Sequence, residues 1–284
     1  MEDQPSFQVT APPPKSPSPT IDTNPATYDF IIEAKGVEIV AVGATSFVER
    51  LADGNIIKTP LQSHHHDTTA ELTIEAKIYQ RIGPHPRLVP IISWDEAEHA
   101  LTMEFMANGT LKDYIEAHPD DISTAQRLRW AREAAEGLQL VHDVGVVHYD
   151  VGPHNFLLDE KLSLKISDFG GSSVDGSRPS ICAGIRYAPS DIAWRRGRKP
   201  DPAGDLFGLG STIYYISTGT EPFHDVESEE VDKRFAACVF PAVDEVLAGD
   251  VIWKCWMGRF ASASEVLSEL TALLGNSTDN GVPP

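Results

Sequence analysis

Residues His148 to Gly170 read HYDVGPHNFLLDEKLSLKISDFG and carry the clearest structural signal in this sequence. Two short apolar runs within this stretch flank an acidic turn, which predicts a β-hairpin. Polar side chains stand at both mouths of the hairpin, with Asp150 and Asn155 before it and Asp168 after it. Because a hairpin brings its two ends together, two carboxylates and one amide oxygen should meet in one small volume. Such oxygen ligands suit Mg²⁺, which proteins hold through one or two carboxylates together with substrate phosphates.

This stretch resembles the catalytic loop and metal-binding turn of the eukaryotic protein kinases, H-R-D-L-x-x-x-N followed by D-F-G. The loop, its spacing, the hairpin and D-F-G occur together, so the resemblance is specific. It implies an α+β fold with two lobes, in one domain of about residues 37–275. The N-lobe, about 37–103, would be a small antiparallel sheet with one helix, and the C-lobe, about 109–275, would be mainly helical.

The resemblance also implies transfer of the γ-phosphate of ATP, with ATP and Mg²⁺ as cofactors and a protein as the substrate. In that chemistry Asp150 would accept or orient the proton of the substrate hydroxyl. Asn155 and Asp168 would hold the Mg²⁺ ion. Phosphoryl transfer depends on positioning and charge stabilisation more than on covalent chemistry.

Further residues are expected at the nucleotide. Lys58 ends an apolar run like the lysine of V-A-I-K, and would contact the phosphates. Glu75 would pair with Lys58, and Glu71, one helical turn earlier, is the fallback partner. Gly43 is the one clear match to the glycine-rich phosphate cover of the family, G-x-G-x-x-G. The segment from residue 103 to 111 resembles the hinge, and its assigned residues are Met103 as a wall of the pocket and the backbone at Glu104 and Met106 as partners of the adenine edge.

Apolar periodicity predicts the elements that carry these residues. Strands are expected at 37–42, 47–51, 55–58, 88–92 and 100–103, and helices at 68–82, 122–144, 226–240, 244–257 and 262–274. A further apolar helix opens at Asp205, which by resemblance would anchor the catalytic-loop backbone.

Two departures from the family pattern lie in the catalytic loop. Tyr149 replaces the arginine that links the loop to a phosphorylated activation segment, so activity without such phosphorylation is expected. Gly152 replaces the lysine that contacts the transferred phosphate in serine/threonine kinases, which predicts slow turnover. His154 either substitutes in part for that lysine or is a simple loop histidine.

Three hypotheses follow. The first is an active protein kinase with serine/threonine specificity preferred over tyrosine. The second is a pseudokinase that acts as an ATP-binding or scaffolding module. The third is a small-molecule phosphotransferase, which ranks last because such enzymes lack the Ala188-Pro189 segment and the helix motif at Asp205.

Composition limits the alternatives. The 284 residues carry a net charge of −19, which argues against nucleic-acid and anionic-membrane partners. Three scattered cysteines and an N-terminus without a secretory signal favour a cytoplasmic location. Residues 1–28 are rich in Pro and Ser and are expected to be a disordered tail, with a partner that recognises proline motifs as an open option. Residues 276–284 are expected to be a C-terminal tail.

Overall fold

The structure is a computed structural model that describes residues 38–43, 45–61, 68–190 and 200–279, with side chains described up to residue 275. The polypeptide divides into two units, Met1–Glu38 and Ile39–Pro284, and the elements discussed below belong to the second from Ile39 onward. The Pro/Ser-rich segment at 1–28 lies outside the described residues.

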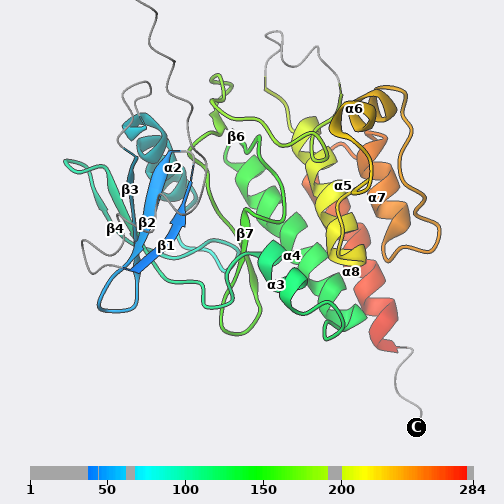
Figure 1. Cartoon of the computed structure of the whole chain (residues 1–284), viewed down its shortest axis with the longest axis horizontal. Coiled ribbons are helices and arrows are strands. Elements are labelled where there is room, and N and C mark those ends of the chain that lie inside the picture. Colours follow the sequence, from blue (N-terminus) through cyan, green and yellow to red (C-terminus); the bar gives the residue numbers. More distant parts are fainter. Residues whose placement is uncertain (1–37, 44, 62–67, 191–199, 280–284) are drawn as a thin grey trace, which may run out of the picture. The chain divides into compact units, whose positions relative to one another are not determined.

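The N-terminal lobe is built on a five-stranded sheet, which confirms the predicted sheet (Figure 1). Its strands, in spatial order, are β1 (Glu38–Val42), β2 (Ser46–Arg50), β3 (Ile56–Pro60), β5 (Ala100–Met103) and β4 (Ile91–Asp95). The pairs β2–β3, β3–β5 and β4–β5 are antiparallel. Lys58 lies on the central strand, opposite Val48 of β2 and Leu101 of β5. This position gives Lys58 a rigid mount.

The strand expected at 88–92 begins later, at Ile91. Pro90 directly precedes it and has no N–H to donate to a ladder. Leu88 instead forms an isolated bridge with Ile166, far along the chain. A non-local contact therefore takes the residue that the local apolar pattern assigned to the sheet.

One helix packs on the sheet. It is α2 (Thr69–Ile82), and it confirms the helix predicted from the spacing of isoleucines. Leu72, Ala76 and Ile78 are almost completely buried on its inner face. The helix ends at Gly83, whose φ of 76° lies in the region that favours glycine.

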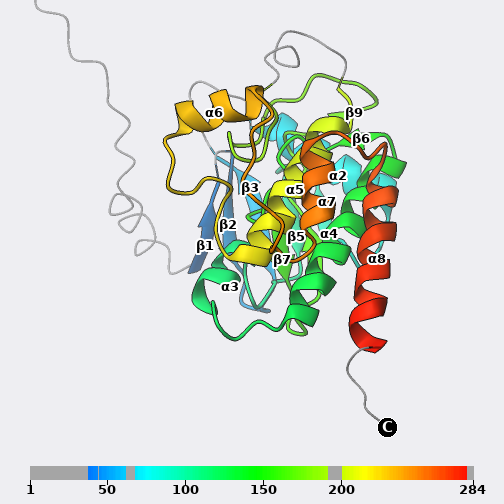
Figure 2. The same ribbon diagram turned by 90° about the vertical axis from the view of Figure 1, so that its right-hand side faces the viewer.

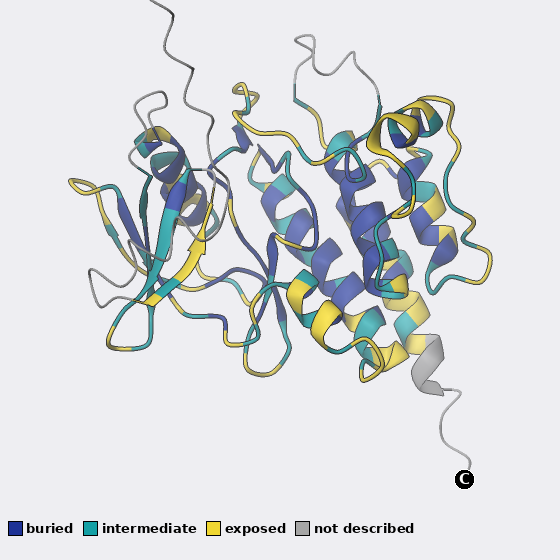
Figure 3. Ribbon diagram, viewed as in Figure 1, coloured by how far each residue is buried: buried dark blue, intermediate teal, exposed yellow. Residues whose placement is uncertain are grey.

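The C-terminal lobe is mainly helical, as predicted (Figures 1 and 2). Its helices are α3 (Leu111–Ala117), α4 (Thr124–Asp143), α5 (Ala203–Thr218), α6 (Ser228–Ala236), α7 (Gly249–Trp256) and α8 (Ala263–Asp279). The long helix α4 lies beside α8 and α5, and Figure 3 shows that α4 and α5 form much of the buried interior. Ser123 caps α4 by accepting a hydrogen bond from the N–H of Gln126. Helix α8 runs to Asp279, into the segment that was expected to be a tail from residue 276.

Two short strand pairs carry the loops of interest. β7 (Phe156–Leu158) pairs with β8 (Leu164–Ile166), which confirms the predicted hairpin. β6 (Val146–Val147) pairs with β9 (Ser173–Val174). These pairs place the segments around residues 150, 155 and 168 near one another.

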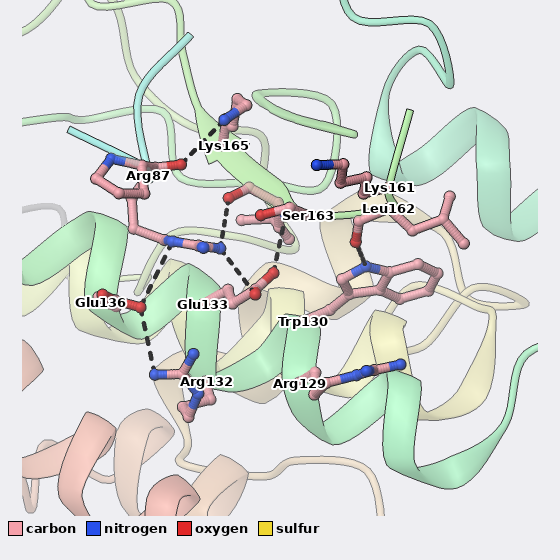
Figure 4. A network of polar contacts seen from close by, with 12 residues as sticks. Arg87, Arg129, Trp130, Arg132, Glu133, Glu136, Lys161, Leu162, Ser163 and Lys165 are labelled. Carbon is pink, nitrogen blue, oxygen red and sulfur yellow. Dashed lines mark hydrogen bonds and ion pairs between the residues drawn. The ribbon is translucent and has the colours of Figure 1, made fainter. Parts of the chain in front are cut away.

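A buried polar cluster joins the two lobes, and we call it the Arg87 cluster (Figure 4). It consists of Arg87, Glu133, Glu136 and the backbone of Leu164. Arg87 Nη1 lies 2.9 Å from Glu133 Oε1 and donates to the Leu164 carbonyl at 3.0 Å. The other oxygen of Glu133 accepts from the Leu164 N–H at 2.8 Å. The residues that precede β4 are therefore fixed to α4 and β8 of the C-terminal lobe.

Among the described residues, the helices are all too short or too polar to cross a membrane.

Candidate active site

Lys58 joins three elements at one point. Its Nζ lies 2.7 Å from Glu75 Oε2 on α2 and 2.6 Å from Asp168 Oδ1, just beyond β8. The side chains of Lys58 and Glu75 are 11% and 1% exposed, whereas that of Asp168 is 50% exposed. Of the two glutamates considered for this pair, the structure selects Glu75. Glu71 instead accepts a hydrogen bond from the hydroxyl of Ser180 at 2.9 Å.

The charges of these three groups depend on one another. Burial alone would lower the pKa of Lys58, but the adjacent carboxylates of Glu75 and Asp168 outweigh it and raise that pKa above its usual value. Burial raises the pKa of Glu75, and the charge of Lys58 opposes that rise. The charge of Lys58 lowers the pKa of Asp168. Lys58 is therefore a cation at neutral pH and keeps Asp168 ionised.

The backbone at Asp168 is held in an unusual conformation. Its φ is 64°, in the left-handed region that Asp tolerates better than most residues. The next residue, Phe169, is completely buried and packs edge-on against Tyr79 and His148, with ring centroids 5.1 and 5.3 Å apart. This packing fixes the turn that directs Asp168 towards Lys58.

Asp205, in the first turn of α5, anchors the catalytic-loop segment through hydrogen bonds. The buried carboxylate of Asp205 accepts from the N–H of His148 at 2.7 Å and from the N–H of Tyr149 at 2.8 Å. His142 Nε2 lies 2.9 Å from the same carboxylate. Tyr149 has a φ of 67°, so these hydrogen bonds hold a strained loop in place.

Asp150 and Asn155 are joined within the loop. Asn155 Nδ2 donates to the carbonyl of Asp150 at 2.8 Å and to Asp150 Oδ2 at 2.9 Å. The Asn155 carbonyl accepts from the N–H of Ser167 at 3.0 Å, which ties the loop to the residue before Asp168. This orientation leaves the Oδ1 atoms of Asp150 and Asn155 without a hydrogen bond from any described residue.

The donor set fits a hard cation that brings its own oxygen ligands. Within the described ranges, no cluster of three or more His, Cys, Asp or Glu side chains could form a complete metal cage. The available ligands are the free amide oxygen of Asn155 and the half-exposed carboxylate of Asp168. Mg²⁺ is commonly held by so few protein oxygens when phosphates complete its coordination.

The segment expected to meet an adenine ring follows β5. Met103 and Met106 are buried, and the N–H of Glu104 donates to the Pro90 carbonyl at 2.9 Å. The Met106 carbonyl accepts from the N–H of Gly109 at 3.0 Å. Neither the carbonyl of Glu104 nor the N–H of Met106 bonds to another described residue. The Glu104 carbonyl and the Met106 N–H are therefore available as one hydrogen-bond acceptor and one donor for a ligand beside this segment.

Gly43 lies in the turn after β1, where its N–H donates to the Ser46 carbonyl at 2.8 Å. Its φ is outside the left-handed region, and a Cβ there would be 3.5 Å from the nearest atom, an ordinary contact. Nothing in the described geometry requires glycine at this position.

The sequence does not predict two contacts that join α2 to the segment after Asp168. One is the hydrogen bond from Ser180 to Glu71 given above. The other is a pair of hydrogen bonds from Arg81 to the two carboxylate oxygens of Asp175, at 2.9 and 2.8 Å. They lie on either side of Glu75 along the helix, so the segment braces the helix that carries it. Sequence separation of about 100 residues gives no local signal for such pairs.

The family model that matches this chain describes the protein kinase domain, and three curated relatives that match it are protein kinases. The protein kinase domain family matches residues 51–273. The calcium and calcium/calmodulin-dependent serine/threonine-protein kinase of Oryza sativa subsp. japonica is 29% identical over 213 residues, covering 72% of this chain and 39% of that protein. The serine/threonine-protein kinase PknJ of Mycobacterium bovis is 30% identical over 227 residues, covering 70% of this chain and 37% of that protein. The serine/threonine-protein kinase RAD53 of Saccharomyces cerevisiae is 25% identical over 181 residues, covering 57% and 22%. The chain thus spans well under half the length of these curated relatives.

Proposed function

Because this chain belongs to the protein kinase family, we propose that it is an active, ATP-dependent kinase that phosphorylates serine or threonine hydroxyls of protein substrates. The observation that carries the proposal is the buried contact of Lys58 with both Glu75 and Asp168. It brings together strand β3, helix α2 and the turn after β8. The proposed catalytic domain covers residues 37–275.

ATP and Mg²⁺ would be the cofactors, and Mg²⁺ would offset the negative charge of the phosphates. Asn155 Oδ1 and the Asp168 carboxylate would hold the ion. Lys58, kept charged by its two carboxylate partners, would hold the phosphates, beneath the turn that contains Gly43. The Glu104 carbonyl and the Met106 N–H would bond the adenine edge, and Met103 would wall the pocket.

Asp150 would act on the substrate. Its Oδ2 is occupied by Asn155 Nδ2, and no described residue donates to its Oδ1. We assign Oδ1 as the oxygen that receives the proton of the substrate hydroxyl. The anchoring of the neighbouring backbone by Asp205 supports this role, since a general base must be held at a fixed place.

The preference for serine and threonine rests on the names of the relatives. The presence of the charged groups of Lys58, Asp150 and Asp168 supports turnover over a purely scaffolding role. The matches to serine/threonine-protein kinases likewise favour a protein substrate over a small molecule. A cytoplasmic location goes with the proposal, supported by the free state of Cys182, Cys238 and Cys255.

The test is phosphate incorporation from Mg-ATP into a peptide array, with peptides that offer serine, threonine or tyrosine. Asp150→Asn should lower the rate by about a hundredfold or more, the usual contribution of a general base. Lys58→Met should also lose activity, whereas Asp143→Asn, an exposed carboxylate near the end of α4, should match the native chain. Equal incorporation by the native chain, Asp150→Asn and Lys58→Met would reject the kinase function. Labelling of tyrosine alone would reject the specificity.

A further inference from the structure

The glycine at position 152 is explained by the histidine at 154. Gly152 is buried, and its φ lies outside the left-handed region, so other residues could adopt its backbone. A Cβ at this position, however, would be 2.5 Å from Cε1 and 2.8 Å from Nδ1 of His154. Contacts under 3.0 Å require one of the two groups to shift. Because the near atoms belong to a side chain that is 43% exposed, a side chain at 152 would displace the ring of His154 from its present position.

The ring that takes this space contacts Asp150. His154 Nε2 lies 3.2 Å from Asp150 Oδ2, the same oxygen that accepts from Asn155 Nδ2 at 2.9 Å. An ionised carboxylate can only accept, so Nε2 must carry the proton in this contact. Two donors thus hold Oδ2 from two sides, and the orientation of the carboxylate about its χ angles is restricted.

The other side of the ring faces the segment at 184–189. The rings of His154 and Tyr187 pack edge-on, with centroids 6.4 Å apart. Tyr187 is buried, whereas the His154 side chain is 43% exposed. His154 therefore bridges a fixed aromatic ring and the carboxylate, while one edge of its own ring remains at the surface.

We propose that His154 is a positioning residue for Asp150, and that Gly152 is present because it makes room for the ring. By holding Oδ2, His154 keeps Oδ1 available to the substrate hydroxyl. The inference rests on the proposed function and adds a residue to it.

The hydrogen bond is tested by two substitutions at one site. His154→Phe keeps the ring volume and removes the donor, and it should lower kcat about tenfold, the effect of one lost hydrogen bond to a charged group. The KM for ATP should change much less than kcat, because the hydrogen bond of His154 is to Asp150, which is assigned to the substrate hydroxyl and not to the nucleotide. His154→Gln restores a donor at similar reach and should recover most of the lost kcat. A native kcat in His154→Phe, or a loss in His154→Gln as large as in His154→Phe, would overturn the proposal.

The steric part is tested by a double-mutant cycle. Gly152→Ala should reduce kcat about tenfold in the native background, since it displaces the ring, and should have little further effect in a His154→Ala background. The free energy of unfolding in urea, measured on the same four proteins without ATP, should show the same non-additivity. Additive effects in both measurements would contradict the displacement of the ring.

Two readouts keep this inference separate from the kinase proposal. The unfolding cycle needs no turnover. The ¹⁵N signals of the His154 ring, assigned by their loss in His154→Phe, should show a protonated Nε2 and should shift in Asp150→Ala. A native chain without kinase activity would reject the proposed function alone, and an unchanged ring signal in Asp150→Ala would reject the positioning role alone.

Discussion

Replacing Lys58 by methionine should destabilise the protein far more than replacing an exposed lysine that pairs with a carboxylate at a similar distance. Methionine has similar length but no charge, so Glu75, 1% exposed, would keep a buried carboxylate without its cation. Removing one partner of a buried ion pair costs roughly 3–5 kcal/mol in the free energy of unfolding. Asp168 should add little, because its side chain is 50% exposed and water can solvate it.

The matched control is Lys254→Met. Lys254 Nζ lies 2.8 and 2.9 Å from the two carboxylate oxygens of Glu269, but these side chains are 37% and 39% exposed. Because water solvates both charges of an exposed pair, this variant should remain close to the native chain in stability. A second variant, Lys58→Met with Glu75→Gln, removes the orphaned charge and should recover part of the lost stability.

The effect should also depend on pH. In the native chain burial raises the pKa of Glu75 and the charge of Lys58 opposes that rise, so the pKa should rise further without Lys58. A carboxyl that binds its proton more tightly when folded than when unfolded lowers stability as pH increases above its unfolded pKa of about 4.3. Lys58 also lowers the pKa of Asp168, which stabilises the native chain above the unfolded pKa of that group and is lost as pH falls. Both pH 5 and pH 7.5 lie above the unfolded pKa of Asp168, about 3.9, so its contribution is the same at the two values. The Glu75 effect alone makes the gap between native chain and variant wider at about pH 7.5 than at about pH 5.

Urea unfolding followed by tryptophan fluorescence measures these differences at the two pH values. A loss in Lys58→Met no larger than that in Lys254→Met would refute the argument from burial. A gap that is the same at both pH values would refute the assignment of the effect to Glu75.

Two further predictions concern the loops. Asp205→Ala should lower the free energy of unfolding by about 2–4 kcal/mol, because the N–H groups of His148 and Tyr149 lose their buried acceptor. Urea unfolding measures this loss, with Asp143→Ala as the exposed control. Equal stabilities of the two variants would contradict the prediction. Ser177→Ala should keep kinase activity within about twofold, as expected for a peripheral substitution, because Tyr149 offers no cation to a phosphorylated segment and Arg81 already pairs with Asp175. A loss greater than tenfold in the peptide assay would show that phosphorylation there is required.

Local patterns predict the parts of this fold that local forces determine. The hairpin of β7 and β8, helix α2 and the long helix α4 follow from apolar spacing and from stop residues such as Gly83. The apolar pattern predicts strand β4 from Leu88, but Pro90 has no N–H for a ladder and Leu88 pairs with the distant Ile166 instead. Boundaries fail where a contact from elsewhere in the chain competes with the local pattern.

The candidate site shows the same division. Glu71 and Glu75 are one helical turn apart, so their spacing gives no physical reason to prefer either as the partner of Lys58. Burial does not separate them, since both are buried in the structure. The resemblance to kinases pointed to Glu75, and the packing of α2 on β3 brings that residue to the lysine. The sequence does not predict the contact of His154 with Asp150. A loop histidine that bonds to the carboxylate and one that only faces solvent occur in the same local sequence pattern.

The Arg87 cluster has a mechanical consequence. The lobes are joined there by buried charges that cannot be separated without leaving one of them unpaired. They are joined a second time by the continuous chain at residues 104–109. The ion pairs of Lys58 with Asp168 and of Arg81 with Asp175 join the lobes again, on the side of helix α2. These two pairs involve half-exposed or exposed carboxylates, whereas the pair of Arg87 with Glu133 is buried and costly to break. The residues around Arg87 should therefore stay together in any motion that opens the contacts of Asp168.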